Sequence, residues 1–233
     1  MKYYFKKGMV TNMEVFENGK NNEQPAAMAE PIRSGDGLTL EEMYAKGMEK
    51  YIAREFSDAL IWLEKAAEQG NINAQFQCSR IYDKGVGGTE KDKAKALMWL
   101  EKAAEQGNAQ AQFLCGEMYD KGEGTEEDKE KALIWYEKAA EQGDNRAQLC
   151  CGDMYYRGEG TEEDKEKALM WYEKTADIDR DQSGFRDSRA QSAAWYRCGE
   201  MYYNGEGTKE DKEKALMWYE KAAKHGHRGA EFN

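Results

Sequence analysis

Cysteines are the residues of this chain best suited to covalent or metal chemistry. Cys78, Cys115, Cys151 and Cys198 occupy the same place in successive copies of one sequence unit, and Cys150 is adjacent to the third of them. Equivalent helices of stacked units lie about 8–10 Å apart, which exceeds the roughly 7 Å between Cα atoms that a disulfide can span. The sequence therefore predicts free thiols that act as small buried hydrophobes in a reducing compartment.

The other candidates for chemistry do not form a recognisable site. His225 and His227 are the only histidines, and they stand near the C-terminal end away from any cysteine pair. This placement favours neither a zinc site nor a Ser-His-Asp triad. The loop Gly122-Glu123-Gly124 is too short for a phosphate loop and carries a glutamate where the anion would have to lie. We therefore expect no catalytic residue, no metal site and no cofactor.

A repeated sequence unit positions all of these residues. Its clearest copy is AQFLCGEMYDKGEGTEEDKEKALIWYEKAAEQG at residues 111–143. Related copies stand at residues 78–107, 151–176 and 198–223. The tryptophans Trp62, Trp99, Trp135 and Trp171 are separated by 37, 36 and 36 residues. Self-similarity at a fixed period of this length is typical of a solenoid of stacked repeats.

Each unit contains two helical patterns that are separated by a glycine turn. The apolar stripes at helical spacing are Ala111, Cys115 and Tyr119 in the first pattern and Ala132, Trp135 and Ala139 in the second. Gly122 can adopt the left-handed conformation that ends a helix, and Thr125 or Asp128 can cap the second helix. Neither helix is long enough to be stable alone, so the stripes predict a core that forms only when units stack.

The order A-Q-x-x-C-G-x-M-Y-x-x-G-E-G-T-x-x-D-x-x-K-A-L-x-W-Y-E-K-A-A resembles the Sel-one-like repeat, a longer relative of the tetratricopeptide repeat. The resemblance covers roughly Thr39 to the C-terminus. A cysteine stands where this family usually has leucine before the first-helix glycine, and Thr125 and its equivalents stand where Val-Pro is common. The resemblance implies an all-α, right-handed α-α superhelix, a solenoid of about five helix-pair repeats that acts as an interaction scaffold.

The domain organisation follows from the repeats. We expect units at 39–71, 72–108, 109–144, 145–176 and 188–226, an insertion at 177–187 and a partial cap at 227–233. Thr39 and Glu42 fit a capping box at the start of the first unit. Residues 1–38 lack the unit and hold both prolines, so they predict a flexible N-terminal tail and linker. The insertion is either a neutral surface loop, since loops tolerate added length, or a protruding element that contacts a partner.

Charge narrows the class of partner. The formal net charge is -11, and residues 1–38 contain equal numbers of basic and acidic residues, so the negative excess lies in the repeats. Such a surface repels phosphate backbones and anionic lipid, which argues against nucleic acid and membranes. The chain also lacks a secretory signal pattern and any apolar run of about 18 residues, so we expect a cytoplasmic protein.

The first helices are the predicted binding surface, because the resemblance places them on the concave face. Residues that point into this groove must avoid the buried stripe of their helix. The predicted groove residues are Tyr44, Met48, Tyr51, Phe76, Arg80, Asp83, Phe113, Glu117, Asp120, Leu149, Asp153, Tyr156, Tyr196, Glu200 and Tyr203. Aromatic anchors beside carboxylates suit a protein segment that carries Lys or Arg. The alternative is that these are ordinary exposed positions that also pack between helices.

The sequence thus favours a non-catalytic scaffold or adaptor that binds a peptide or a partner domain in its concave groove. We expect a protein or peptide partner with basic residues, and we expect no nucleic acid, membrane or small-molecule substrate. A structural assembly protein and a regulator or inhibitor of an enzyme are the alternatives. The assembly role requires apolar positions on the convex face, where the pattern instead places Glu130, Lys131, Glu137 and Lys138.

Overall fold

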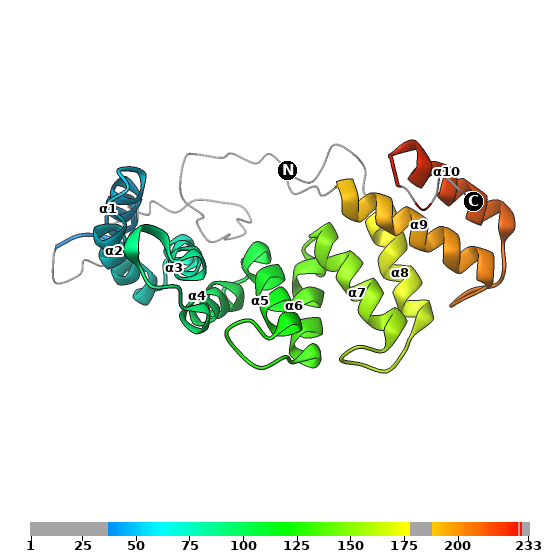
Figure 1. Cartoon of the computed structure of the whole chain (residues 1–233), viewed down its shortest axis with the longest axis horizontal. Helices are drawn as coiled ribbons and strands as arrows, with labels where there is room; N and C mark the ends of the chain where they lie inside the picture. The colour runs from blue at the N-terminus through cyan, green and yellow to red at the C-terminus, as the bar shows by residue number, and fades with distance from the viewer. Residues whose placement is uncertain (1–36, 178–187, 228, 230–233) are drawn as a thin grey trace, which may run out of the picture. The chain divides into compact units, whose positions relative to one another are not determined.

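The repeats fold into α-helices that pack as five consecutive pairs (Figure 1). The computed structural model describes residues 37–177, 188–227 and 229. The helices are α1 (Leu40–Ile52), α2 (Phe56–Glu68), α3 (Ile72–Lys84), α4 (Lys93–Glu105), α5 (Ala109–Lys121), α6 (Lys129–Glu141), α7 (Asn145–Arg157), α8 (Lys165–Ala176), α9 (Ser188–Asn204) and α10 (Lys212–Lys224), with a short 3-10 turn at Val86–Gly88. No strand occurs in these described ranges, and the predicted all-α solenoid of helix pairs is confirmed.

The helix boundaries follow the signals in the sequence. Thr39 and Glu42 form the predicted capping box at the start of α1. Asp128, rather than Thr125, caps α6 by accepting a hydrogen bond from the amide of Lys131 at 3.0 Å. Gly122 ends α5 in the left-handed conformation, at φ 65°. Aspartates equivalent to Asp128 cap α4, α8 and α10, so the loop and cap recur with the unit.

The two helices of a pair approach closely because four of the five first helices carry a glycine opposite a large side chain, whereas α3 has Ser79 at this position. A β-carbon added to Gly116 of α5 would lie 2.5 Å from the ring of Tyr136 in α6. The same relation holds within the next unit, between Gly152 of α7 and Tyr172 of α8. The predicted stripes of both helices are buried in one continuous core, which includes Cys115. This repeated contact fixes how each pair closes.

Successive units are joined by the same polar bonds. The amide of Gln112 donates a hydrogen bond to the carbonyl oxygen of Ala104 at 3.0 Å, and Gln148 bonds Ala140 at 3.1 Å in the next joint. The hydroxyl of Tyr119 donates to Glu101 in the preceding second helix at 2.5 Å. Equivalent tyrosine–glutamate bonds join the other units, namely Tyr82 with Glu64, Tyr155 with Glu137 and Tyr202 with Glu173. These bonds hold the register between neighbouring pairs.

The last joint differs in sequence, because the Gln-Gly pair that follows α2, α4 and α6 is missing after Ala176. The α8 helix ends at Ala176, and α9 begins at Ser188 and is longer than the other first helices. Trp195 stands at the position that Gln112 occupies in α5, and its indole N–H donates to the carbonyl oxygen of Ala176 at 3.0 Å. The indole therefore takes the place of the Gln112 amide, and the amide of Gln191 donates to the same carbonyl oxygen at 3.4 Å.

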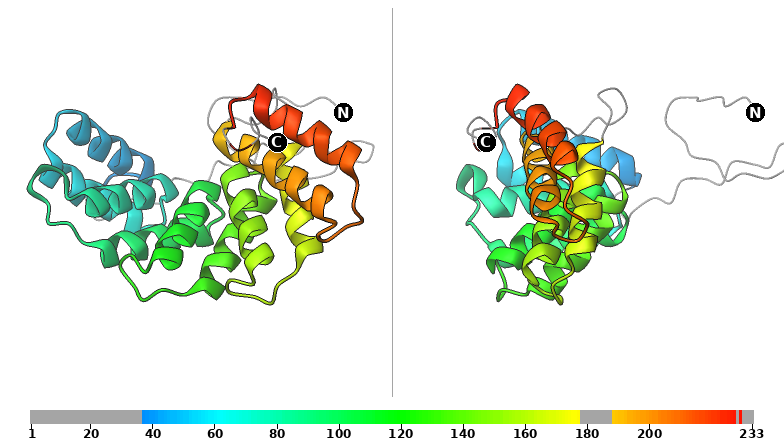
Figure 2. Two further views of the ribbon diagram at one scale, coloured as in Figure 1. Left: turned by 45° about the vertical axis from the view of Figure 1, so that its right-hand side comes forward. Right: turned by 90° about the vertical axis from the view of Figure 1, so that its right-hand side faces the viewer.

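Several predicted segments lie wholly or largely outside the described residues. They are the tail at 1–38, of which 1–36 are not described, the insertion at 177–187, of which 178–187 are not described, and most of the partial cap at 227–233. The two ends of the described row of pairs are α1–α2 and α9–α10 (Figure 2). These ends bear on the inference drawn below.

Candidate functional site

The residues predicted to line the groove all lie on first helices, namely α1, α3, α5, α7 and α9. Most of their side chains are half-buried, and Arg80 and Tyr203 are exposed. Tyr203 is the more important of the two for binding, because 52% of this aromatic residue is exposed to solvent. The first-helix face is therefore a row of partly accessible aromatic and carboxylate groups.

Phe113 departs from the prediction that it points into a groove. Only 7% of it is exposed. Its ring lies 5.8 Å from that of Tyr136 between centroids, and the guanidinium of Arg146, from the next unit, lies 4.0 Å above the ring. Arg146 covers Phe113, so this side chain belongs to the packing between units and offers little surface to a partner.

A small cleft between α3, α4 and α5 brings some of the predicted residues together. Arg80, Asp83 and Glu117 line it, and its volume is about 180 Å³. Lys93 in the same cleft lies 2.6 Å from Asp83 and 2.6 Å from Glu123 of the following loop. The sequence analysis missed Lys93, although a lysine recurs at this position in the later units. The lysine ammonium group partly neutralises the carboxylates of the cleft.

The other carboxylates on this face also have basic neighbours. Glu117 pairs with Lys121 at 2.8 Å and Asp120 with Lys129 at 2.8 Å. These side chains are about a third exposed or more, so such pairs contribute little to stability and exchange with solvent. A partner cation can therefore replace the intramolecular partner at small energetic cost.

A second cluster forms around Arg197 in α9, which the sequence analysis did not single out. Its guanidinium lies 3.1 Å from Glu200 and 3.6 Å from Asp153 of α7. The hydroxyl of Tyr172 donates to Asp153 at 2.7 Å. Burial raises the pKa of the Tyr172 hydroxyl, so this group remains a donor at neutral pH. Arg197 thus links two predicted carboxylates from different units.

The aromatic members of the predicted set also make intramolecular contacts. Tyr156 donates to Glu206 at 2.8 Å. The ring of Tyr196 lies 5.7 Å from that of Tyr219 and 4.6 Å from His227, which stacks on it. The expectation of an exposed groove and the alternative of inter-helix packing therefore both describe part of this face.

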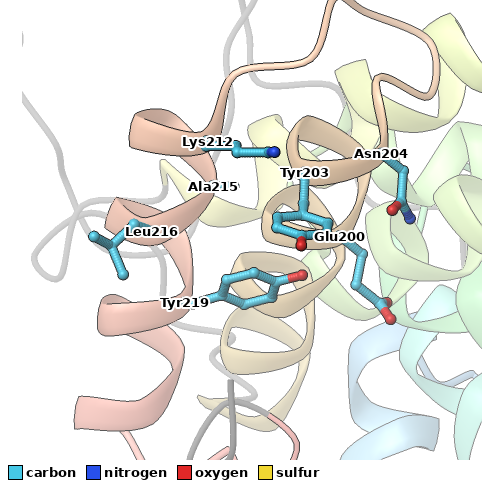
Figure 3. Close-up of a pocket in the computed structure, with 7 residues that line it drawn as sticks. All are labelled: Glu200, Tyr203, Asn204, Lys212, Ala215, Leu216 and Tyr219. Atoms are coloured by element: carbon cyan, nitrogen blue, oxygen red, sulfur yellow. The ribbon is translucent and has the colours of Figure 1, made fainter.

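A wider hollow lies at the last pair, between α9 and α10 (Figure 3). Its volume is about 500 Å³. The lining residues are Glu200, Tyr203, Asn204, Lys212, Ala215, Leu216 and Tyr219. Two of them, Glu200 and Tyr203, were predicted from sequence. The figure shows the rings of Tyr203 and Tyr219 close to each other and Lys212 above them.

The second helices carry an apolar row that the sequence analysis did not recognise. Exposed apolar residues stand at one equivalent position in every unit: Ile61, Met98, Ile134, Met170 and Met217. They alternate along the helix surface with charged residues such as Lys131 and Lys138, which masked the pattern in the sequence. The second helices therefore carry this apolar row beside the charged residues named from the sequence, Glu130, Lys131, Glu137 and Lys138.

All five cysteines are free, and burial raises the thiol pKa of each, to about 12 for Cys150. Among residues 37–177, 188–227 and 229, no cluster of three potential metal ligands occurs. In the same ranges, no helix has the length and apolarity needed to span a bilayer.

Comparison with known families now defines the class of protein. The family model described as Sel1 repeat matches residues 37–71, 72–108, 109–144, 146–179 and 192–227. These matches include most of the chain, and the chain belongs to the Sel1 repeat family. Proteins of this family generally mediate protein–protein interactions and are typically non-catalytic scaffolds.

Solved structures agree with this assignment. A Sel1 repeat protein from Oxalobacter formigenes is 31% identical, with a TM-score of 0.68, over 84% of this chain and 78% of its own. A protective antigen present in uropathogenic Escherichia coli strains, described as displaying an SLR fold, is 31% identical with a TM-score of 0.70. That match covers 83% of this chain and 40% of the antigen, so this chain spans less than half of its length. A comparison with curated proteins found no match.

Proposed function

We propose that this chain is a scaffold whose first-helix face binds a protein segment bearing Lys or Arg. The observation that carries the proposal is the set of half-exposed aromatic side chains on α1, α3, α7 and α9, together with half-exposed carboxylates on α3, α5, α7 and α9. Aromatic residues anchor a bound chain, and weakly paired carboxylates select basic side chains. The net charge of -11 in the whole chain supports a cationic partner.

The test replaces three carboxylates without changing their shape: Glu117→Gln, Asp153→Asn and Glu200→Gln. The matched control is Glu130→Gln, Glu166→Gln and Glu213→Gln, three exposed glutamates at one equivalent position on the second helices. The probe is a fluorescent peptide of alternating lysine and leucine, and a glutamate–leucine peptide serves as the negative probe. The measurement is fluorescence anisotropy at two salt concentrations.

We expect the first variant to bind the basic peptide about tenfold more weakly, because each of three exposed charge pairs contributes up to about 1 kcal/mol. Binding should also weaken as salt rises, since exposed charges are screened. The control variant should bind as tightly as the original chain. Equal losses in both variants would show that only net charge matters and would contradict the assignment of this face.

A second candidate function is assembly through the second helices. The row formed by Ile61, Met98, Ile134, Met170 and Met217 favours it, because each of these apolar side chains is at least 40% exposed. A variant with Ile134→Lys and Met170→Lys places charges at the centre of this row, where the two side chains are 51% and 48% exposed. If this face drives assembly, the variant should lower the mass measured by light scattering. An unchanged mass would exclude this role.

A further inference from the structure

The C-terminal pair exposes a leucine that the equivalent positions of units two to four bury. Leu97, Leu133 and Leu169 are 5–6% exposed, whereas Leu216 is 57% exposed. All four are equivalent in the repeat. Tyr219 and Ala223 lie on the same side of α10 and are more open than their interior counterparts. The end of the row is therefore an interface surface without its usual cover.

The interior joints show what covers such a surface. The first helix of the next unit packs on the second helix, as α5 packs on α4, and it places Leu114 and Met118 in the cleft with Leu100. Its tyrosine, Tyr119, donates a hydrogen bond to Glu101. The covering element is thus an amphipathic helix with apolar residues four positions apart and a phenol near its C-terminal end.

The loop after the covering helix makes the next contact. Glu123 lies 2.6 Å from Lys93, the first residue of α4, and Glu206 lies 2.9 Å from Lys165, the first residue of α8. The glycine after Glu123 is so close to the preceding unit that a β-carbon on it would lie 2.3 Å from the carbonyl oxygen of Lys93. A carboxylate just beyond the helix is therefore part of the interface.

The C-terminal pair has the residues that would make each of these contacts, but in the described residues no following unit contacts them. Lys212 stands where Lys93 and Lys165 stand, and it pairs instead with Glu210 of its own unit at 3.1 Å. Glu220 stands where Glu101 accepts the tyrosine hydroxyl, and it is exposed. The hollow beside them, about 500 Å³, compares with about 180 Å³ at the occupied cleft (Figure 3).

The N-terminal end of a second copy is a poor occupant. Lys46, Glu49 and Lys50 of α1 stand where Cys115, Met118 and Tyr119 of α5 contact the preceding unit. Burying these charges against Leu216 would cost several kcal/mol because their hydration would be lost. The α1–α2 turn also lacks the G-E-G sequence of the other loops. Head-to-tail stacking of identical chains is therefore disfavoured.

We propose that the end cleft lined by Lys212, Leu216 and Tyr219, together with Glu220 further along α10, binds an amphipathic helix of another protein. The helix carries two bulky apolar residues four positions apart, a tyrosine next to the second of them and a carboxylate in the turn that follows. Leu216 and Tyr219 take the apolar residues, Glu220 accepts from the tyrosine hydroxyl, and Lys212 pairs with the carboxylate. The cleft adjoins the first-helix face and shares Glu200 and Tyr203 with it, whereas the contacts proposed here come from residues of α10, a second helix.

The probe is a fluorescent peptide with the sequence of residues 109–124, which is α5 with its loop and fills the equivalent cleft between α3 and α4. It is titrated by anisotropy, under reducing conditions, into the full chain and three variants. Leu216→Asp removes the apolar contact, and Lys212→Glu reverses the charge. Met217→Asp is the matched control, because Met217 is exposed on the same helix but does not line the cleft.

We expect Leu216→Asp to weaken binding at least about tenfold, since a buried leucine side chain dominates such a contact. Lys212→Glu should also weaken binding, and a peptide with Glu123→Lys should restore it. Met217→Asp should have no effect. Absence of binding to the full chain, equal losses in Leu216→Asp and Met217→Asp, or no rescue by the reversed charges would each overturn the proposal. A chain whose mass doubles with concentration unless Leu216 is changed to Asp would overturn it too, because the occupant would be a second copy.

Discussion

The first and the last helix pair present different surfaces to solvent, although both are built from one repeated unit. On the outer side of α1 the positions that face a preceding unit hold Lys46, Glu49 and Lys50. The ammonium of Lys46 lies 3.9 Å above the ring of Trp62, so its charge covers an aromatic group that interior units bury. On α10, the outward position holds Leu216 as in the interior.

This difference shows that a few residues decide whether a repeat ends a stack or continues it. Repeats contact only their neighbours, so an end unit keeps its fold when one face is polar. The α1–α2 pair has replaced contact residues by charges on that face. The α9–α10 pair has kept the contact residues, so the two ends of the described row present different surfaces.

The largest expected effect compares the same substitution inside the row and at its end. Leu133→Ala should lower the free energy of unfolding by about 2–5 kcal/mol, because it leaves a cavity in a packed joint. Leu216→Ala should cost less than about 1 kcal/mol, since most of this side chain is already in contact with water. Chemical denaturation followed by circular dichroism measures both. Similar losses would mean that the end face is covered in solution.

The second prediction converts the N-terminal end into a contact surface. Lys46→Ala, Glu49→Met and Lys50→Tyr place on α1 the kinds of side chain that α5 presents to α4. We expect this chain to associate head-to-tail, and such heterologous contacts extend without closing. Light scattering should then show a mass that grows with concentration. Adding Leu216→Asp should return the mass to that of the original chain, and growth that survives this change would locate the contact elsewhere.

The third prediction concerns how readily the two parts of the row open. Burial raises the thiol pKa of both Cys115 and Cys198, so each reacts with iodoacetamide only when its surroundings open. The last pair has a neighbour on one side only, so Cys198 should react roughly tenfold faster than Cys115. Mass spectrometry of alkylated peptides from native protein measures the two rates. Faster reaction at Cys115 would reverse the order of stability.

The smallest expected effect is a pH dependence of the interior joints. The Lys165 ammonium, by hydrogen bonding, holds the pKa of Glu206 below its ordinary value of 4.5, and Lys93 does the same for Glu123. A lowered pKa means that the ionised form is favoured in the folded state. The stability that it contributes is present above the unfolded pKa and is lost as pH falls through the folded pKa.

Hydrogen exchange between about pH 5 and pH 3 should therefore show loosening at these two joints. The amides next to Lys212, which pairs with a glutamate of its own unit, serve as the internal control. Exchange rates also depend intrinsically on pH. The Glu123→Gln variant, which lacks this carboxylate, measures that dependence at the Lys93 joint. If the Glu123→Gln variant loosened to the same extent, the loosening would not come from the Glu123–Lys93 pair, and the prediction would be wrong.

Sequence reasoning predicted the pair architecture, the capping box at Thr39 and the buried stripes, because each depends on residues within one unit. It misplaced Phe113, since Arg146, which covers that ring, comes from the next unit. It also overlooked Arg197, whose two acidic neighbours come from different helices. Contacts between units depend on the stacking geometry, and a pattern read along one helix does not contain that geometry.

The inserted segment illustrates the same limit. The sequence indicated an insertion at 177–187 and left open whether it is a neutral surface loop or an element that contacts a partner. The structure ends α8 at Ala176 and shows that Trp195 satisfies the carbonyl oxygen that a glutamine satisfies elsewhere. No spacing rule indicates this replacement, because the two side chains differ in size and share only an N–H donor.

The contact between a loop glycine and the preceding unit has a consequence for how such a gene changes. Gly124, Gly160 and Gly207 each lie against the backbone of a lysine in the unit before, at Lys93, Lys129 and Lys165. Unequal recombination that adds or removes one whole repeat joins two boundaries of the same kind, and every such contact is restored. A gain or loss of half a repeat would set a glycine loop against the wrong backbone. A gain or loss of whole repeats, in steps of about 36 codons, therefore keeps every such contact, and the added residues between Trp171 and Trp218 leave the contact of Gly207 with Lys165 in place.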